Sequence, residues 1–381
     1  MAEKQQELSK SRQALLDKVL KLFEGKRLDW TKGWSSPGAP LPPVSGVSGT
    51  RYHGCNNVLL WLVAIERGYT DNRWVTYHQI EENGWRFKKN ESGESLGKGA
   101  GVAVELFRYY DKATKQDLDW SEFRKLTLDE QRAYWEENVR RITRYYTVFN
   151  GDVVEGMPPL EQTQIRHLTP EERDERAEQL IRAWNDKQCR IIHDGGNSAY
   201  YQPATDQVHL PVRTSFHSIE EYYGTALHEI GHSTGHPSRL NRDLSGGFGS
   251  DKYAREELRA EFASIFMQQE LGLPLGEYHI KNHAAYLQSW GAEVKKDPNV
   301  LFDAIKDAGR ISTCVFENAA GMEASAASEA ESQREGMESP LFAMVSSMPD
   351  TEGVAAPAHT EQTANADSPF LRAMLGEDVN E

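Results

Sequence analysis

The feature that most constrains this chain is the stretch from Ser218 to His236, which contains a His-Glu-x-x-His pattern from His228 to His232. Apolar residues recur through it at helical spacing, and Ser218 followed three residues later by Glu221 is a helix-start signal. Residues four apart on a helix leave the same face, so both imidazoles can reach one metal ion. The stretch therefore predicts a helix that presents two metal ligands.

Glu229 follows the first of these histidines and would lie close enough to polarise a metal-bound water without binding the ion itself. The chain holds 12 histidines, so the pattern can also arise by chance. The competing interpretation is two surface histidines with a solvated glutamate between them. The helical context and the acidic residues downstream favour metal binding.

A zinc site that keeps a position open for water needs a third protein ligand. A third histidine six residues after His232 is excluded because position 238 is serine. The other source is a carboxylate from a helix predicted over residues 251–271, where Glu257 and Glu261 share a face. We favour Glu257 as ligand and Glu261 as the carboxylate that orients a ligand histidine, and the reverse assignment stays open. His236 is a weaker candidate.

Such a site would perform metal-assisted hydrolysis, with Glu229 as the base that takes a proton from the bound water. Tyr286 is the candidate for stabilising the negative charge that develops on the substrate, with Tyr253 as the alternative. Simple packing is the competing interpretation of Tyr286. Zn²⁺ is the expected cofactor, and Mn²⁺ suits the same donors.

The pattern of elements predicts an α+β fold in three parts: residues 1–155 with mixed helices and strands, residues 165–317 around the metal helix, and the tail 318–381. Residues 102–110 and 144–149 are predicted strands, and the charged segment 111–141 between them is predicted to be mostly helical. In the second part, a hairpin over residues 199–210 precedes the metal helix, and its edge could pair with an extended peptide.

The tail holds 2 Lys or Arg against 12 Asp or Glu and few large apolar residues, which predicts disorder. Within it, residues 339–345 and 368–375 each begin with Ser-Pro and carry apolar positions, so each could fold on an unknown partner. Chance similarity is an equal explanation for this repeat.

Three cysteines at positions 55, 189 and 314 have neither metal nor redox spacing, which is typical of free thiols in a reducing compartment. The polar N-terminus has no apolar segment of the secretory type, and no run approaches the length of a membrane span. We therefore expect a soluble cytoplasmic protein without a membrane partner.

Seven of the nine tryptophans lie before residue 155, several of them beside Arg or Lys. Aromatic rings stack on bases while cations hold phosphates, so this pattern is typical of proteins that bind single-stranded nucleic acid. The competing interpretation is that most of these rings belong to the core. The candidate DNA-binding residues are Arg51, Tyr52, Arg73, Trp74, Trp85, Arg86, Lys88 and Lys89.

Several stretches, in order along residues 10–317, resemble the ArdC-like antirestriction proteins of conjugative plasmids. They include residues 52–56 (Tyr-His-Gly-Cys-Asn), 73–77 (Arg-Trp-Val-Thr-Tyr), 146–150 (Tyr-Thr-Val-Phe-Asn), 228–236, 253–258 and 286–290. The resemblance implies an N-terminal domain that binds single-stranded DNA and a C-terminal zincin-like metallopeptidase domain. It further implies that the protein binds incoming plasmid DNA and protects it from restriction enzymes.

Two other hypotheses remain open from the sequence. One is a DNA-binding protein whose metal site is structural or inactive. The other is a soluble metallopeptidase whose N-terminal domain binds protein in place of DNA.

Overall fold

The computed structural model describes residues 8–23, 41–159, 170–247, 249–273 and 284–319 of the 381-residue chain. Helices and strands are mixed in it, as the α+β prediction requires. The predicted tail motifs and residues 320–381 lie outside the described part. Within the described residues, no helix combines the length and the apolar character needed to cross a bilayer.

A five-stranded sheet of order β1-β2-β6-β4-β5 organises the N-terminal half. Neighbouring strands are antiparallel except β1 and β2, which are parallel. The strands of this half are β1 (Val44–Ser45), β2 (Arg73–Thr76), β3 (Arg86–Phe87), β4 (Val102–Asp111), β5 (Gln116–Asp117), β6 (Val139–Asn150) and β7 (Val154–Glu155). β3 and β7 form a separate two-stranded sheet.

Helix α3 (Gly54–Arg67) is the buried helix of this half. Every residue from Val58 to Ala64 is buried, because the helix is apolar on all sides and lies between the sheet and other helices. Gly68 ends it in the left-handed conformation that glycine adopts without strain. The other helices here are α1 (Lys10–Phe23), α4 (Tyr77–Glu82), α5 (Trp120–Phe123) and α6 (Leu128–Asn138).

The side chain of Asn56 covers the free edge of β4 at Glu105. Its amide nitrogen donates to the carbonyl of Glu105 at 2.6 Å, and its amide oxygen accepts from the Glu105 N–H at 3.0 Å. Both groups would otherwise be open to pairing with another strand. One amide side chain thus takes the place of a neighbouring strand.

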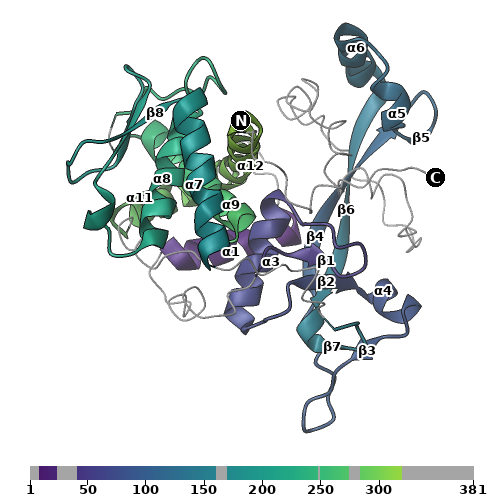
Figure 1. Cartoon of the computed structure of the whole chain (residues 1–381). Coiled ribbons are helices and arrows are strands. Elements are labelled where there is room, and N and C mark those ends of the chain that lie inside the picture. The colour runs from purple at the N-terminus through teal and green to yellow at the C-terminus, as the bar shows by residue number, and fades with distance from the viewer. Residues whose placement is uncertain (1–7, 24–40, 160–169, 248, 274–283, 320–381) are drawn as a thin grey trace.

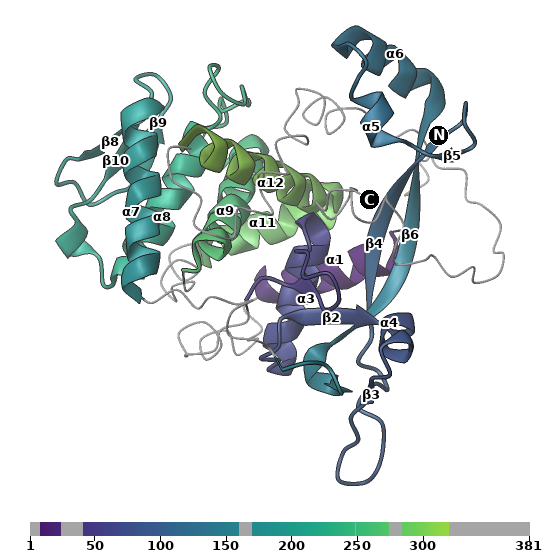
Figure 2. The same cartoon turned by 45° about the vertical axis from the view of Figure 1, so that its right-hand side comes forward.

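Strands β4 and β6 continue beyond the sheet as an arm, which rises away from the helices in Figures 1 and 2. Its tip has a small core of its own, built on Leu118, Phe123 and Val139 with aromatic rings packed around them. The helices predicted within residues 111–141 are present as α5 and α6. The prediction was wrong at Asp111, Gln116–Asp117 and Val139–Arg141, which lie in β4, β5 and β6.

The C-terminal half joins a three-stranded sheet of order β8-β10-β9 to a group of helices. β9 is an edge strand, antiparallel to β10, so the predicted hairpin is present. The elements are α7 (Pro170–Lys187), β8 (Arg190–His193), β9 (Tyr200–Gln202), β10 (Gln207–Leu210), α8 (Ile219–Ser233), α9 (Asp251–Leu271), α11 (Ala284–Lys296) and α12 (Asn299–Ala319).

One hydrophobic cluster runs through both halves. It contains Leu60 and Trp74 from the first half and Leu227, Met267 and Ile305 from the second, all essentially inaccessible to water. Helix α12 packs on α9, α7 and α3, and α1 packs on α11. The two halves therefore share an interior.

Candidate metal centre

Helix α8 carries the histidine pair, and its start is fixed by local hydrogen bonds. The Ser218 hydroxyl accepts from the Glu221 N–H at 3.2 Å, and the Glu221 carboxylate accepts from the His217 N–H at 2.9 Å. The cap is thus as predicted, except that Glu221 reaches back to His217 and not to Ser218. Leu227 and Ile230 are wholly buried, so the opposite face of α8 is anchored in the core.

Helix α9 lies against α8 and brings the acidic residues to the histidines. It runs over Asp251–Leu271, the range predicted from the sequence. The Ser250 hydroxyl caps its first turn, and Gly272 ends it in the left-handed conformation. Between the helices, the Ser264 hydroxyl donates to the carbonyl of Gly224 at 2.9 Å, which fixes how the two backbones lie against each other.

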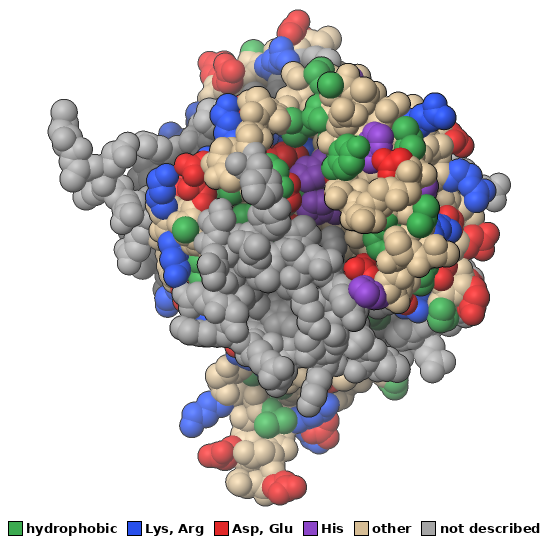
Figure 3. All heavy atoms as spheres, turned by 90° about the vertical axis from the view of Figure 1, so that its left-hand side faces the viewer, with side chains coloured by type: hydrophobic (Ala, Val, Ile, Leu, Met, Phe, Trp, Pro, Cys, Tyr) green, Lys and Arg blue, Asp and Glu red, His purple; other side chains and the backbone are tan. Residues whose placement is uncertain are grey.

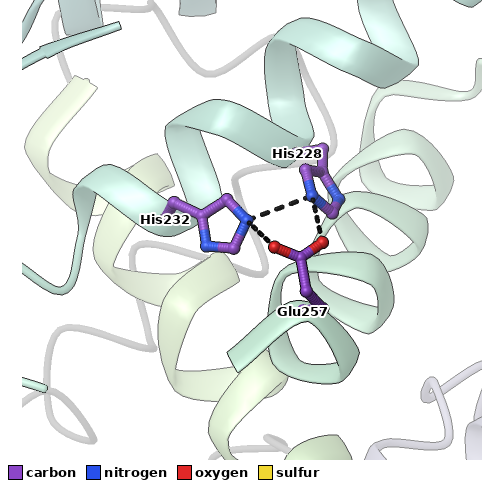
Figure 4. Close-up of side chains that lie close together, drawn as sticks. All are labelled: His228, His232 and Glu257. Carbon is purple, nitrogen blue, oxygen red and sulfur yellow. Dashed lines mark hydrogen bonds and ion pairs between the residues drawn. The ribbon is translucent and has the colours of Figure 1, made fainter. Parts of the chain in front are cut away.

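The side chains of His228, His232 and Glu257 converge between the two helices (Figure 4). The two Nε2 atoms are 3.1 Å apart. One oxygen of Glu257 lies 3.5 Å from Nε2 of His228, and the other lies 3.4 Å from Nε2 of His232. Two imidazoles and one carboxylate are the donor set of a zinc site with three protein ligands, so these residues fit a divalent ion.

A carboxylate also lies within ion-pair distance of the outer nitrogen of each imidazole. Nδ1 of His228 lies 3.4 Å from Glu261, and Nδ1 of His232 lies 3.3 Å from Glu256. Such partners fix the orientation of a ligand histidine and direct Nε2 toward the ion. Glu257 thus faces both inner nitrogens, while Glu261 and Glu256 face one outer nitrogen each.

Sequence reasoning missed Glu256 and Arg242 as parts of this site. The Arg242 guanidinium is bidentate with Glu256, at 2.7 and 3.1 Å, and donates to the carbonyl of Gly231 at 2.9 Å. It therefore joins the carboxylate that orients His232 to the end of helix α8. Helical spacing could have placed Glu256 beside Glu257, but Arg242 lies in an irregular segment with no motif to mark it.

The electrostatics of the cluster favour positive charge at the imidazoles. Burial disfavours a charged ring, but Glu257 and Glu261 outweigh it and raise the pKa of His228 well above its usual range. For His232, burial is outweighed by Glu256 and Glu257, and the pKa is raised to about 9. The same pairs lower the pKa of Glu257 despite its burial. These carboxylates stabilise a cation at this point, whether a proton or a metal ion carries the charge.

Glu229, the predicted base, is buried beside His228 on α8, with 7% of its surface exposed. Tyr253 lies in the first turn of α9 and is half-buried. Tyr286 lies on α11, and its side chain is outside the part of the chain that the structure describes. His236 is not in the cluster of His228, His232 and Glu257, and its Nδ1 lies 2.7 Å from the Ser238 hydroxyl.

The cluster lies near the molecular surface. The His232 side chain is 13% exposed, whereas that of His228 is 5% exposed. Figure 3 shows histidine side chains beside acidic ones on one face of the molecule. The histidine pair is therefore held by groups in the protein interior, and a ligand can reach it from the side of His232.

Two family models match the chain. Residues 9–149 match the N-terminal domain of anti-restriction factor ArdC, and residues 175–307 match a zincin-like metallopeptidase. The chain is also 32% identical over 295 residues to an uncharacterized protein of Sinorhizobium fredii, covering 77% of this chain and 87% of that protein. Two DNA primases TraC of Escherichia coli are each 35% identical over 305 and 304 residues, but the chain spans only 26% and 19% of their lengths.

Two crystal structures of the antirestriction protein ArdC from plasmid R388 have a similar fold. The Mn(II)-bound one gives a TM-score of 0.59 at 29% identity, covering 82% of this chain and 99% of that one. The metal-free one gives 0.58 at 30% identity, covering 83% and 100%. The chain belongs to the ArdC antirestriction family.

In this ArdC-family protein, the eight predicted DNA-binding residues do not form one uniform surface. Arg86, Lys88 and Lys89 are exposed, although Arg86 pairs with Glu155 at 2.9 Å. The other five are buried or half-buried, and they are Arg51, Tyr52, Arg73, Trp74 and Trp85.

These five residues have identifiable protein partners. Arg51 forms an ion pair with Glu270 of α9, and Arg73 pairs with Asp71 at 2.7 Å. Tyr52 packs against the main core, and burial raises the pKa of its hydroxyl. Trp85 packs against the small cluster around Val75.

Trp74 corrects one expectation from the sequence. It is 0% exposed and packs within the main core, with Tyr69 edge-on at 6.1 Å between ring centroids. A base has no access to a ring that is covered on both faces, so Trp74 cannot be a stacking platform in this fold. An arginine next to a tryptophan in the sequence does not distinguish a core ring from a base-stacking ring, because on β2 the half-buried Arg73 adjoins the buried Trp74 and Val75.

Proposed function

We propose that this protein binds incoming single-stranded DNA through its N-terminal half and hydrolyses peptide bonds at a metal centre in its C-terminal half, and so counteracts restriction. The observation that carries the proposal is the convergence of His228, His232 and Glu257, with a carboxylate on each outer imidazole nitrogen. Membership of the ArdC antirestriction family supports the link to DNA.

We propose Zn²⁺ as the ion, with His228, His232 and Glu257 as its ligands. Two nitrogen donors and one carboxylate suit zinc with a position left for water. Mn²⁺ is the alternative, supported by the Mn(II)-bound crystal structure of the R388 protein. Analysis of the metal content of protein purified without added metal, followed by competition between the two ions, separates these choices.

Glu229 is our candidate for the general base. A divalent ion held by the three ligands would supply a Lewis acid and a water of lowered pKa. Glu229 would accept the proton of that water and return it to the leaving amine. Glu261 and Glu256 would keep the imidazole rings oriented, because each faces an outer nitrogen. Tyr286 remains the candidate for stabilising the developing oxyanion.

For the N-terminal half, we propose contacts between DNA phosphates and the exposed cations Arg86, Lys88 and Lys89. Each cation that neutralises a phosphate releases a counterion, so affinity should fall linearly with salt on a double-logarithmic scale. A labelled single-stranded oligonucleotide titrated over a salt series tests this. An affinity that is independent of salt would contradict it.

The biological proposal is tested by conjugation into a restricting recipient. Plasmids would carry the wild-type gene, the Glu229→Gln variant, a Glu175→Gln control or a deletion. Glu175 is exposed on α7 and lies outside the metal cluster, so its replacement should leave protection intact. Protection should fall on deletion.

The Glu229→Gln plasmid decides the role of the peptidase. If protection is lost with this variant, then hydrolysis is needed for it. If this plasmid transfers as well as wild type, the metal centre has no catalytic part in antirestriction, and the proposal of a structural or inactive site replaces ours.

A further inference from the structure

The shaft of the β4–β6 arm is a two-stranded ribbon with an open edge. β4 and β6 pair from Val102↔Val148 to Asp111↔Val139, but β2 pairs only with residues 148–150 of β6. Among the described strands, none pairs with the other side of β6 from Val139 to Thr147. Figures 1 and 2 show the far part of the arm rising away from the body, whereas near its base Tyr146 packs against the main core and Glu105 bonds residues of α1.

This open edge carries positive charge without compensation. Strand β6 reads VRRITRYYTVFN, with three arginines and no acidic residue. Arg140 and Arg144 are both exposed, and neither has an ion-pair partner in the described part of the chain. By contrast, Arg108 on β4, opposite Ile142, is paired with Asp117. The fold thus neutralises Arg108 on β4, whereas Arg140 and Arg144 on β6 have no ion-pair partner among the described residues.

Exposed apolar groups accompany these charges. Tyr145 is 55% exposed, and Ile142 is 36% exposed between the two arginines. Arg140, Ile142 and Arg144 leave one face of the ribbon, whereas Tyr145 leaves the other. A ligand that runs along the edge of β6 can touch both faces, whereas one that lies flat on a single face cannot.

The spacing of the two arginines and the chemistry of the side chains around them indicate which class of ligand fits. Four residues of strand separate Arg140 from Arg144 by about 13 Å, so one compact anion cannot bridge their backbones. An extended polyanion can reach both cations. An exposed aromatic ring next to them fits a polyanion whose units also carry flat, stackable faces, which is an unpaired nucleic-acid strand.

We propose that single-stranded DNA lies along the open edge of β6, with phosphates on Arg140 and Arg144 and a base stacked on Tyr145. This inference deepens the DNA-binding part of the proposed function and rests on it. It names a surface that none of the eight residues expected from the sequence belongs to.

Protection of the edge is a second reason to have charges there, because charged side chains keep free strand edges from pairing with other chains. That role is filled by charge of either sign. Replacing both arginines by glutamate keeps the edge charged and removes only the attraction for phosphate. Charge reversal therefore separates the two roles.

The experiment compares full-length wild type with Arg140→Glu/Arg144→Glu in oligonucleotide titrations over a salt series. Each phosphate contact on a single strand contributes about 0.7 to the double-logarithmic slope, so losing two should reduce it by about 1.4. Arg182→Glu/Arg190→Glu is the matched control, because both arginines are exposed in the C-terminal half and the change in net charge is the same. It should leave the slope as in wild type.

Tyr145→Ala tests the stacking contact separately. Loss of one stacked base should weaken binding by roughly 5- to 150-fold and leave the salt slope unchanged. Tyr145→Phe should restore the affinity, because it restores the ring. Unfolding midpoints of all variants should match wild type, since the substituted side chains are on the surface. Arg140→Gln/Arg144→Gln replaces the glutamate pair if that pair fails to fold.

Each result has one meaning. If wild type binds and the ribbon variants bind equally well, the ribbon is not the surface and DNA binding by this protein stands. If wild type itself does not bind, the DNA-binding part of the proposed function fails. If the variants lose affinity for duplex but not for single strands, the assignment to an unpaired strand is overturned.

Discussion

The metal cluster and the β4–β6 ribbon differ in how their charged side chains are paired. In the cluster, both histidines face carboxylates, and Glu256 is in turn held by Arg242. On the ribbon, Arg140 and Arg144 are exposed and without an ion-pair partner among the described residues. The difference follows from the ligands that we propose. A single ion needs donors fixed within ångströms, whereas a flexible polymer needs cations that can move to meet it.

The burial of the charged side chains determines how much each region contributes to the stability of the fold. Buried charges need partners, because removing one partner leaves the other desolvated and unpaired. Exposed arginines on a ribbon can be lost with little effect on folding. Substitutions in the cluster should therefore affect ligand binding and structure together, and those on the ribbon should affect binding alone.

The largest effect should come from an aromatic residue that the sequence suggested for the binding surface. Trp74→Ala should lower the free energy of unfolding by about 3–5 kcal/mol, because the ring is wholly buried. Chemical denaturation monitored by circular dichroism measures this. Tyr77→Ala is the control, since Tyr77 is 54% exposed and its loss should leave the free energy of unfolding close to that of wild type. An equal effect of both variants would contradict the burial of Trp74.

Removal of a proposed metal ligand comes next. Structural zinc sites, which have four protein ligands, bind with about 10–16 kcal/mol, or roughly 2.5–4 kcal/mol per ligand. Glu257→Ala should therefore weaken zinc binding by roughly 10²–10³-fold. Competition with a chromogenic chelator measures this affinity. Glu270→Ala, near the other end of α9, should bind zinc like wild type. If Glu261→Ala causes the large loss and Glu257→Ala a small one, then the reverse assignment is correct.

A smaller loss is expected from the residues that orient His232. Glu256→Ala and Arg242→Gln should each weaken metal affinity by about 10- to 100-fold, because the outer nitrogen of His232 loses its fixed partner. The double variant should lose little more than either single one, since both act through the same contact. Additive losses in the same chelator assay would show that Arg242 acts by another route.

The smallest effect is predicted for the exposed pair of Arg86 and Glu155. Arg86→Ala should leave the free energy of unfolding close to that of wild type, because both side chains are largely in solvent. Its effect should appear in the salt dependence of oligonucleotide binding. A large loss of stability would mean that this exposed pair, like the buried charges of the metal cluster, is needed for folding.

The metal helix could be predicted from sequence because its determinants are local. The cap at Ser218, the apolar stripe and the histidine spacing all lie within one stretch of α8. Glu257 and Glu261 could be proposed because helical spacing puts them on one face of α9. Arg242 could not be found in this way, since its contact with Glu256 depends on the path of an irregular segment between two helices.

Sequence patterns predicted the burial of the aromatic residues less well. Trp74 and Trp85 both have an arginine neighbour, yet one is wholly buried and the other is half-buried. Which face of a short strand meets the core depends on the sheet and helices around it. The arm could not be predicted from the sequence for the same reason. Its charged helices were visible in the sequence, but only strand pairing reveals that Arg140 and Arg144 lie on a part of β6 whose second edge is not paired by any described strand.

The interior shared by the two halves has a consequence for how the molecule melts. Leu60 of α3 and Ile305 of α12 belong to one water-free cluster, so neither half can open without exposing apolar surface of the other. Heating the intact chain should give a single calorimetric peak, and fragments separated between residues 155 and 170 should aggregate. The two halves would then be inherited, lost or transferred between proteins together.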